Sequence, residues 1–148
     1  MITHQNHKFI YNEIASFELP NGMCINYDCE AMSQDNFELI APDGSFRFVI
    51  EFFTSSKNAR ELIEELNDPS EHDVLSPPCA ITTPTGLNGF TITYWAGKEL
   101  YEEYTLDLSD NERCNFWLMC QINKFLERDF HERVKAEFLA NLKPTEGH

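Results

Sequence analysis

The sequence contains one pair of side chains that could support nucleophilic catalysis. Cys79 follows two prolines, and His72 lies seven residues before it. A cysteine becomes a nucleophile when a nearby base takes its proton, and histidine is the usual base. Cys79 nevertheless begins an apolar segment, and no third residue is evident to orient the histidine. We therefore expect no catalytic residue, with a small enzyme that uses Cys79 and His72 as the alternative.

The other cysteines and the histidines do not form a metal-binding pattern. Structural zinc sites use cysteines separated by two to four residues, which Cys24 and Cys29 match loosely and which Cys114 and Cys120 do not. Cys120 also alternates with apolar residues of an expected strand. The five histidines form neither H-x-x-x-H nor H-E-x-x-H. We expect free thiols and no metal ion or other cofactor.

Glu102 is the carboxylate whose position is least ordinary. Its neighbours on the same face of the expected strand are Leu100, Tyr104 and Leu106. A carboxylate on an apolar face can be buried and perturbed, which would mark a functional site. We expect the simpler arrangement, in which Glu102 lies at a strand edge or a frayed end. Glu103 points to the opposite face, so the two carboxylates cannot act on one substrate together.

Composition and charge limit the kinds of partner. The 148 residues are 42% hydrophobic and include twelve Phe, which indicates one domain, residues 1–148, with a substantial core. The 25 acidic residues outnumber the 11 Lys and Arg and give a net charge of −14. Such a chain repels the phosphates of nucleic acids and anionic membranes. We expect no nucleic acid and no membrane as partner; an acidic immunity protein or nucleic-acid mimic that binds a basic partner is a further alternative.

No segment has the pattern of a leader or a membrane anchor. The first eight residues are polar, and no apolar run approaches the roughly 20 residues that span a bilayer. The five cysteines are an odd number with irregular spacing, which does not indicate a disulfide framework. We expect a cytoplasmic protein.

Alternating apolar residues predict strands over most of the chain. The strongest strand covers 46–53, and further strands are expected near 17–19, 23–27, 37–41, 79–83, 90–95, 99–108 and 115–122. A 3.6-residue period predicts a helix that Ser55 or Ser56 caps, followed by a polar connection over 68–78. A second helix is expected over about 129–142. The predicted fold class is α+β: an antiparallel sheet of about six to seven strands, a helix between two strand groups and a C-terminal helix.

Odd-numbered positions of these strands suggest a mixed face of aromatic, Met and small polar side chains. Aromatic residues and Met are enriched where proteins bind partners. We expect a non-enzymatic binding or adaptor protein that uses this face, unless a helix or the N-terminal segment covers it. The candidate binding residues are Val49, Thr93, Trp95, Tyr101, Trp117 and Met119.

The order of elements resembles the PsbP-like fold. The residues that carry the resemblance are 46–53 leading into 59–66, then 89–95, 101–108, 115–122 and 134–142. Within that fold the chain looks most like the DcrB-related group, which includes the Eag-type chaperones of type VI secretion effectors. The resemblance implies a binding or chaperone-like role, because Eag-type chaperones shield apolar effector segments on a sheet surface. We expect a protein partner, with a homodimer as one option.

Overall fold

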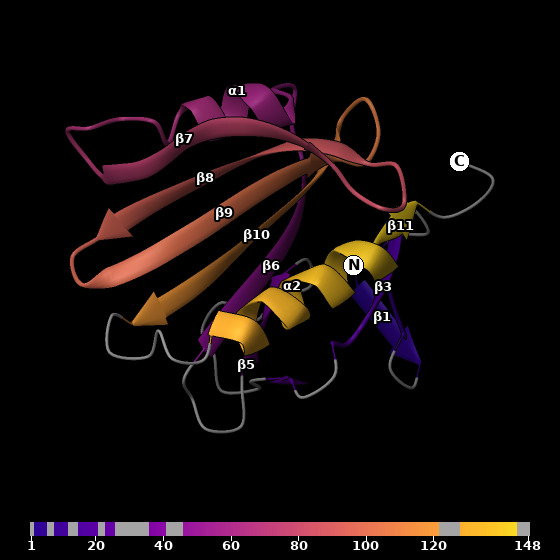
Figure 1. Ribbon diagram of the computed structural model, residues 1–148. Helices are drawn as coiled ribbons and strands as arrows, with labels where there is room; N and C mark the ends of the chain where they lie inside the picture. Colours follow the sequence, from indigo (N-terminus) through magenta and orange to yellow (C-terminus); the bar gives the residue numbers. More distant parts are fainter. Residues whose placement is uncertain are drawn as a thin grey trace.

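A seven-stranded antiparallel sheet organises the chain in the computed structural model (Figure 1). The structure describes residues 2–5, 8–11, 15–20, 23–25, 36–40, 46–121 and 128–144. The strands of this sheet follow the order β4-β5-β6-β10-β9-β8-β7. They are β4 (Cys24–Ile25), β5 (Asn36–Ile40), β6 (Phe46–Thr54), β7 (Asp73–Thr82), β8 (Asn88–Ala96), β9 (Glu99–Asp107) and β10 (Glu112–Gln121). The predicted fold class is confirmed.

A second, smaller sheet joins the two ends of the described chain. Its order is β1-β2-β3-β11, formed by β1 (Ile2–Gln5), β2 (Lys8–Tyr11), β3 (Ala15–Glu18) and β11 (Lys143–Pro144). The sequence did not predict β1, because the first eight residues are polar and show no apolar alternation. It did not predict β2 either, because the three consecutive apolar residues Phe9, Ile10 and Tyr11 do not alternate. Helix α1 (Ala59–Glu64) lies between β6 and β7, and helix α2 (Arg128–Asn141) lies between β10 and β11.

Helix α1 begins later than Ser55 or Ser56. Its N-cap is Asn58, whose side chain accepts the backbone N–H of Glu61, while the Glu61 side chain accepts the N–H of Asn58. This reciprocal capping box satisfies two of the free N–H groups of the first turn. The Ser55 hydroxyl oxygen instead accepts the N–H of Lys57 in the turn before the helix.

Strand β7 corrects the predicted polar connection. The strand starts at Asp73 rather than at Cys79 and contains Pro77 and Pro78. Its pairing with β8 shifts register on both sides of Ser76, so the prolines fall in an irregular stretch. β7 is the last strand of its sheet, and an edge strand tolerates proline because its outer N–H groups need no ladder partner.

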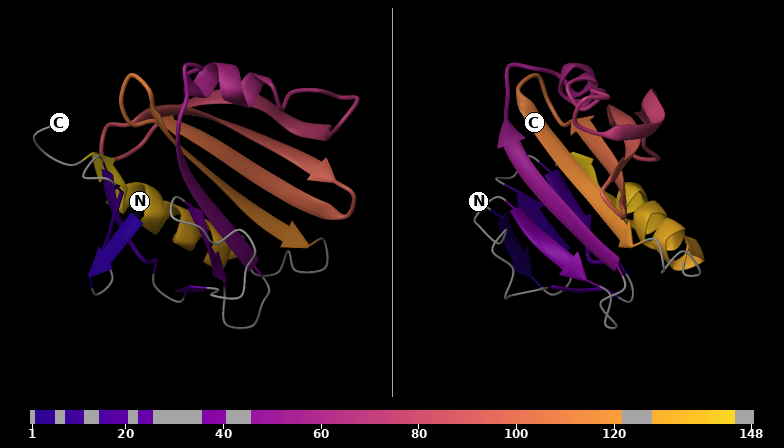
Figure 2. Two further views of the ribbon diagram at one scale, coloured as in Figure 1. Left: turned by 180° about the vertical axis from the view of Figure 1, so that it is seen from behind. Right: turned by 90° about the vertical axis from the view of Figure 1, so that its left-hand side faces the viewer.

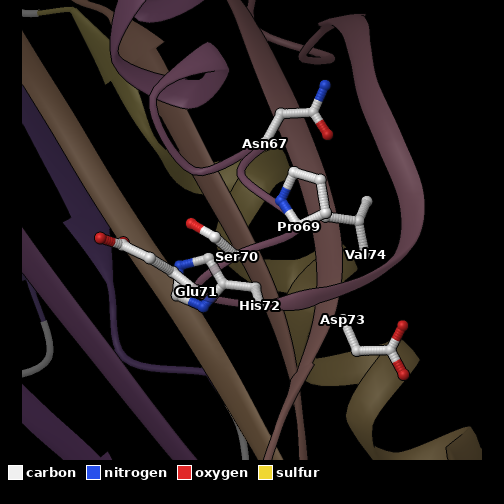
Figure 3. A pocket seen from close by; sticks show the side chains of 7 residues that line it. All are labelled: Asn67, Pro69, Ser70, Glu71, His72, Asp73 and Val74. Carbon is white, nitrogen blue, oxygen red and sulfur yellow. The ribbon is translucent and has the colours of Figure 1, made fainter.

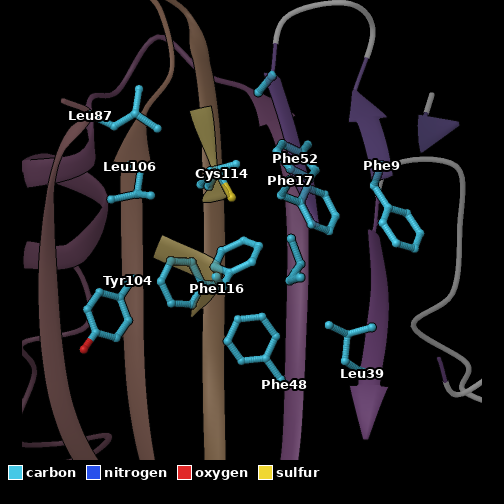
Figure 4. Packing of buried hydrophobic residues seen from close by; sticks show 14 of the residues in the cluster. Phe9, Phe17, Leu39, Phe48, Phe52, Leu87, Tyr104, Leu106, Cys114 and Phe116 are labelled. Atoms are coloured by element: carbon cyan, nitrogen blue, oxygen red, sulfur yellow. The ribbon is translucent and has the colours of Figure 1, made fainter. Parts of the chain in front are cut away.

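The main core lies between the large sheet, α2 and the small sheet. Phe48 and Phe116 each pack edge-on against Phe138 of α2, and Phe17 of β3 contacts both Phe52 and Phe138. Figure 4 shows Phe48, Phe52 and Phe116 on the large sheet, with Phe17 of β3 beside Phe52. Helix α1 covers the opposite face near β8 and β9 (Figures 1 and 2). There Ile63 packs with Ile92 and Tyr94.

Candidate functional site

The predicted binding residues lie on both faces of the large sheet. Met119 pairs with Tyr101 in register, and Trp117 pairs with Val49, so these four residues share the face that carries α1. Thr93 and Trp95 pair with Glu102 and Leu100 and lie on the α2 face. The single mixed face expected from odd-numbered positions is therefore wrong for these two residues.

The length of one turn causes this split. Gly97 adopts φ +65°, a conformation that favours glycine, and forms a two-residue turn with Lys98. Ala96 consequently lies opposite Glu99, and every odd-numbered residue of β8 lies opposite an even-numbered residue of β9. A two-residue turn at Gly97-Lys98 predicts this register from the sequence alone. The register matters because a shift of one residue would move every side chain of a strand to the other face.

Four rings form a continuous row on the α1 face, which we call the aromatic row. It contains His72, Tyr94, Tyr101 and Trp117. His72 lies 4.4 Å from Tyr94, Tyr94 stacks on Tyr101 at 5.4 Å, and Tyr101 lies 5.6 Å from Trp117, measured between ring centroids. Tyr101 and Trp117 are half-buried. The row thus crosses from the segment before β7 to β10. His72, Tyr101 and Trp117 keep part of their surface in solvent, and Tyr94 is buried.

Val49 and Met119 support the aromatic row instead of extending its exposed surface. Val49 is 5% exposed and Met119 is 7% exposed. Val49 lies opposite Trp117, and Met119 lies opposite Tyr101. A partner on this face would accordingly meet the rings rather than these two apolar side chains.

Glu103 is a functional candidate that the sequence-based reasoning missed. It lies on the α1 face, opposite Trp117 and Ile92. Tyr94 Oη donates to Glu103 Oε1 at 2.9 Å, and Asn115 Nδ2 donates to Glu103 Oε2 at 3.2 Å. Burial raises the pKa of the Glu103 carboxyl, although these two hydrogen bonds oppose the rise. The alternation in β9 placed Glu103 on the face opposite Glu102, but this carboxylate was not considered further as a site residue.

A cavity of about 230 Å³ opens beside Glu103, between α1 and strands β6, β9 and β10. We call it the helix-side pocket. It combines carboxylates, apolar side chains and neutral hydrogen-bonding groups. Its lining residues are Glu51, Phe53, Leu62, Glu65, Leu66, Glu103, Thr105 and Asn115. Such a mixture suits a ligand that has both an apolar and a charged part.

A second hollow of about 410 Å³ lies over the segment between α1 and β7 (Figure 3). All its lining residues come from 67–74, and Asp68 holds the turn by accepting the N–H and hydroxyl of Ser70. Nδ1 of His72 is buried there without a hydrogen-bond partner. Because one short segment lines the whole hollow, it lacks the converging groups of a built site.

Solved structures share this arrangement of strands and helices. One is the solution structure of cyanobacterial PsbP (CyanoP) from Synechocystis sp. PCC 6803, with 13% identity, a TM-score of 0.57 and 86% of each chain covered. Another is the Ran-binding protein Mog1p of Saccharomyces cerevisiae, with 9% identity, a TM-score of 0.57 and 95% of each chain covered. The chain has a PsbP-like fold.

The likeness extends to the fold and no further. A structure from Bacteroides thetaiotaomicron also matches, with 14% identity and a TM-score of 0.52 over 98% of this chain and 51% of that one. The sequence matches no protein-family model and no curated protein. At such low identity, no residue role can be transferred from one PsbP-like protein to another.

The PsbP-like sheet keeps Cys79 and His72 apart. Cys79 lies opposite Thr91, whereas Asp73, the residue after His72, lies opposite Trp95. Four residues along β8 correspond to roughly 13 Å. His72 packs on Tyr94 of the α1 face, and the Cys79 thiol lies 3.7 Å from the carbonyl of Ala80. The geometry therefore does not support a Cys–His pair.

Glu102 lies in the middle of the sheet and not at the strand edge that we expected. It belongs to β9, between β8 and β10, on the α2 face. Lys135 of α2 donates to Glu102 Oε2 at 3.0 Å, and Tyr104 Oη donates to the same oxygen at 3.3 Å. The apolar face tolerates this carboxylate because the helix above it supplies a cation.

The described part of the chain contains neither a cluster of metal-binding side chains nor a membrane-spanning helix. No three His, Cys, Asp or Glu side chains are grouped there to hold a metal ion. No helix within those ranges is long and apolar enough to cross a bilayer. Cys29 and the side chains of Cys24 and Cys120, for which free thiols were expected rather than a zinc site, lie outside what the structure describes.

Proposed function

We propose that the chain is a non-enzymatic binding protein that holds a protein partner against the aromatic row. The observation that carries this proposal is the exposed part of Tyr101 and Trp117 within one stacked run of rings. Large rings lose little conformational entropy on binding, and interface hot spots are enriched in Trp and Tyr.

The surroundings of the two rings support this role. Trp117 lies opposite the buried Val49 and Tyr101 opposite the buried Met119, so each ring has a buried neighbour on the adjacent strand. Such neighbours restrict the rings before a partner arrives. Tyr101 Oη donates to a carboxylate oxygen of Glu99 at 2.8 Å, which fixes its orientation further. Preorganised rings of this kind bind more tightly than mobile ones, because less freedom is lost.

The fold likeness agrees with a protein partner. Mog1p is named a Ran-binding protein, so a chain with this fold can bind another protein. The narrower likeness to DcrB-related proteins and Eag-type chaperones forms part of the proposal. In that form, the aromatic row would shield an apolar segment of the partner, as Eag-type chaperones do with effectors.

Two tryptophans on opposite faces provide a matched test. We expect wild-type protein to capture a partner from native lysate, Trp117→Ala to lose at least tenfold of that capture, and Trp95→Ala to retain it. Circular dichroism melting curves should show that both variants fold. If the partner is a second copy of the chain, sedimentation should show a wild-type dimer and a Trp117→Ala monomer.

Equal capture by wild type and Trp117→Ala would contradict the proposal. So would a loss in the Trp95→Ala variant alone, because it would move the binding surface to the α2 face. Turnover of any substrate that depends on Cys79 would contradict the non-enzymatic assignment.

A further inference from the structure

We infer that the helix-side pocket receives a basic side chain, lysine or arginine, from the partner; this inference rests on the binding role proposed above. The pocket has the two surfaces that such a side chain needs. Phe53, Leu62 and Leu66 supply apolar walls for the aliphatic stem. Glu103 supplies a largely buried carboxylate for the cationic head.

Of the three carboxylates in the pocket, only Glu65 forms an ion pair with a lysine or arginine of the described residues. Lys57 forms an ion pair with Glu65. Within the described ranges, no Lys or Arg forms an ion pair with Glu51 or Glu103. Burial is the main cause of the raised pKa of Glu103; the charge interaction with His72 lowers this pKa, and the charge of nearby Glu51 raises it. Two carboxylates that repel each other in one cavity are stabilised by an external cation.

Glu103 also has hydrogen-bonding capacity in reserve. An ionised carboxylate can accept about four hydrogen bonds. Tyr94 and Asn115 each provide one donor, on different oxygens. The remaining positions can accept donors from an ammonium or guanidinium group. Asn115 is fixed in turn by donating to Thr105 Oγ1 at 3.0 Å, so the acceptor is held in a defined orientation.

A basic side chain fits this pocket better than a bare metal ion does. Metal sites need several oxygen, nitrogen or sulfur ligands at close range, and no such group of three exists in the described part of the chain. The three apolar wall residues would also contribute nothing to a metal ion. They would instead bury the methylene groups of a lysine or arginine.

The pocket and the aromatic row are neighbours. Glu103 lies opposite Trp117 in register, and the Tyr94 hydroxyl joins the aromatic row to Glu103. One partner segment can therefore place an apolar residue on Trp117 and a basic residue beside Glu103. This arrangement also gives a use to the net charge of −14, because an acidic chain attracts a basic partner over long distances.

Small cations test the pocket without knowledge of the partner. We would titrate ¹⁵N-labelled full-length protein with Nα-acetyl-arginine methylamide, its lysine analogue and its citrulline analogue, which has the shape of arginine but no charge. We expect the two cations to shift the amide signals of Leu66 and Asn115 in a saturable way. The citrulline probe should cause at most a tenth of that shift at equal concentration.

Variants with the same change of charge locate the effect. Glu103→Gln should weaken binding of the arginine probe at least tenfold. Glu51→Gln, a change at an exposed residue, should weaken it at least threefold and provides a test if Glu103→Gln does not fold. Glu64→Gln should leave it unchanged, because Glu64 is an exposed residue of α1 that does not line the pocket.

Equal shifts with arginine and citrulline would overturn the inference, and so would equal effects of Glu51→Gln and Glu64→Gln. The two proposals can fail separately. If no cation binds while Trp117→Ala still abolishes capture, the pocket assignment is wrong and the binding role stands. If the arginine probe binds while capture of the partner does not depend on Trp117, the proposed binding role of the aromatic row is wrong.

Discussion

Arg113 and Asp107 face each other across β10 and β9, with Nε of Arg113 3.1 Å from Oδ1 of Asp107. The same carboxylate oxygen accepts the backbone N–H of Ala59 at 3.0 Å, in the first turn of α1. The Arg113 guanidinium also donates to four backbone carbonyls, those of Lys57, Ser109, Asp110 and Glu112. One buried arginine thus fastens the start of α1 to the turn between β9 and β10.

Replacement of this arginine should be costly. Arg113 is 3% exposed, so Arg113→Met would leave several carbonyls without a donor in a place that water reaches poorly. We expect the free energy of unfolding to fall by about 2–4 kcal/mol, measured by urea denaturation. The control is Arg60→Met, an exposed change within α1, which should cost less than about 0.5 kcal/mol. Similar losses in both variants would contradict the fastening role.

The raised pKa of Glu103 makes stability depend on pH in a defined direction. Its folded-state pKa lies above its unfolded value because of burial, so the native state binds more protons between the two values. Stability should therefore fall as pH rises through that interval and stay level above it. We expect the wild-type free energy of unfolding, minus that of Glu103→Gln, to decrease with rising pH there. Urea unfolding from about pH 4 to about pH 8 would measure this difference.

A direct titration would check the same point. The ¹³C signal of the Glu103 side-chain carboxyl should report a midpoint above the ordinary glutamate value. A midpoint at or below that value would contradict the raised pKa of Glu103. With the arginine probe bound, the midpoint should shift to lower pH, because a cation favours the ionised carboxylate.

The two described free cysteines should differ in reactivity. Cys79 is exposed, whereas Cys114 is fully buried and its burial raises the pKa of the thiol. Iodoacetamide should label Cys79 in the folded protein and Cys114 only in urea. Mass spectrometry of tryptic peptides would distinguish the two sites. Comparable labelling of both in the native protein would contradict the placement of Cys114 in the core.

The ion pair between α2 and the sheet should contribute modestly to stability. Lys135 Nζ lies 3.0 Å from Glu102 and 2.9 Å from Glu132. Burial works against the charged form of Lys135, yet its hydrogen bonds and charge interactions with Glu132 and Glu102 outweigh this and raise its pKa. A double-mutant cycle with Lys135→Met and Glu102→Gln should give a coupling energy of about 1 kcal/mol. The same cycle with Glu132→Gln, whose side chain is more exposed, should give a smaller value.

The sequence predicted those elements of the fold that have a clear local pattern. The alternation over 46–53 and the apolar stripe over 129–142 identify β6 and α2 on their own. The start of β7 was predicted wrongly as a polar connection, because Pro77 and Pro78 usually exclude a strand. An edge strand permits these prolines, but which strand lies at the edge is a property of the whole sheet.

The candidate site was predicted less completely, because it depends on relations between strands. Tyr101 and Trp117 were placed together correctly, since β9 and β10 keep odd-numbered residues on one face. Trp95 was placed with them wrongly, since the turn at Gly97 reverses this relation for β8. The helix-side pocket requires Leu62 and Leu66 to lie over Glu103, and no local pattern predicts where a helix docks.

The small sheet has a consequence for the order in which the chain can fold during synthesis. Ser16 of β3 pairs with Lys143 of β11, and Phe17 packs against Phe138. These contacts join residues near opposite ends of the described chain, so the ribosome must release almost all of it before they can form. Until then Phe17, the one ring of β3, can pack on Phe9 and Phe52 but lacks its contact with Phe138, and apolar surface that stays exposed during synthesis favours aggregation.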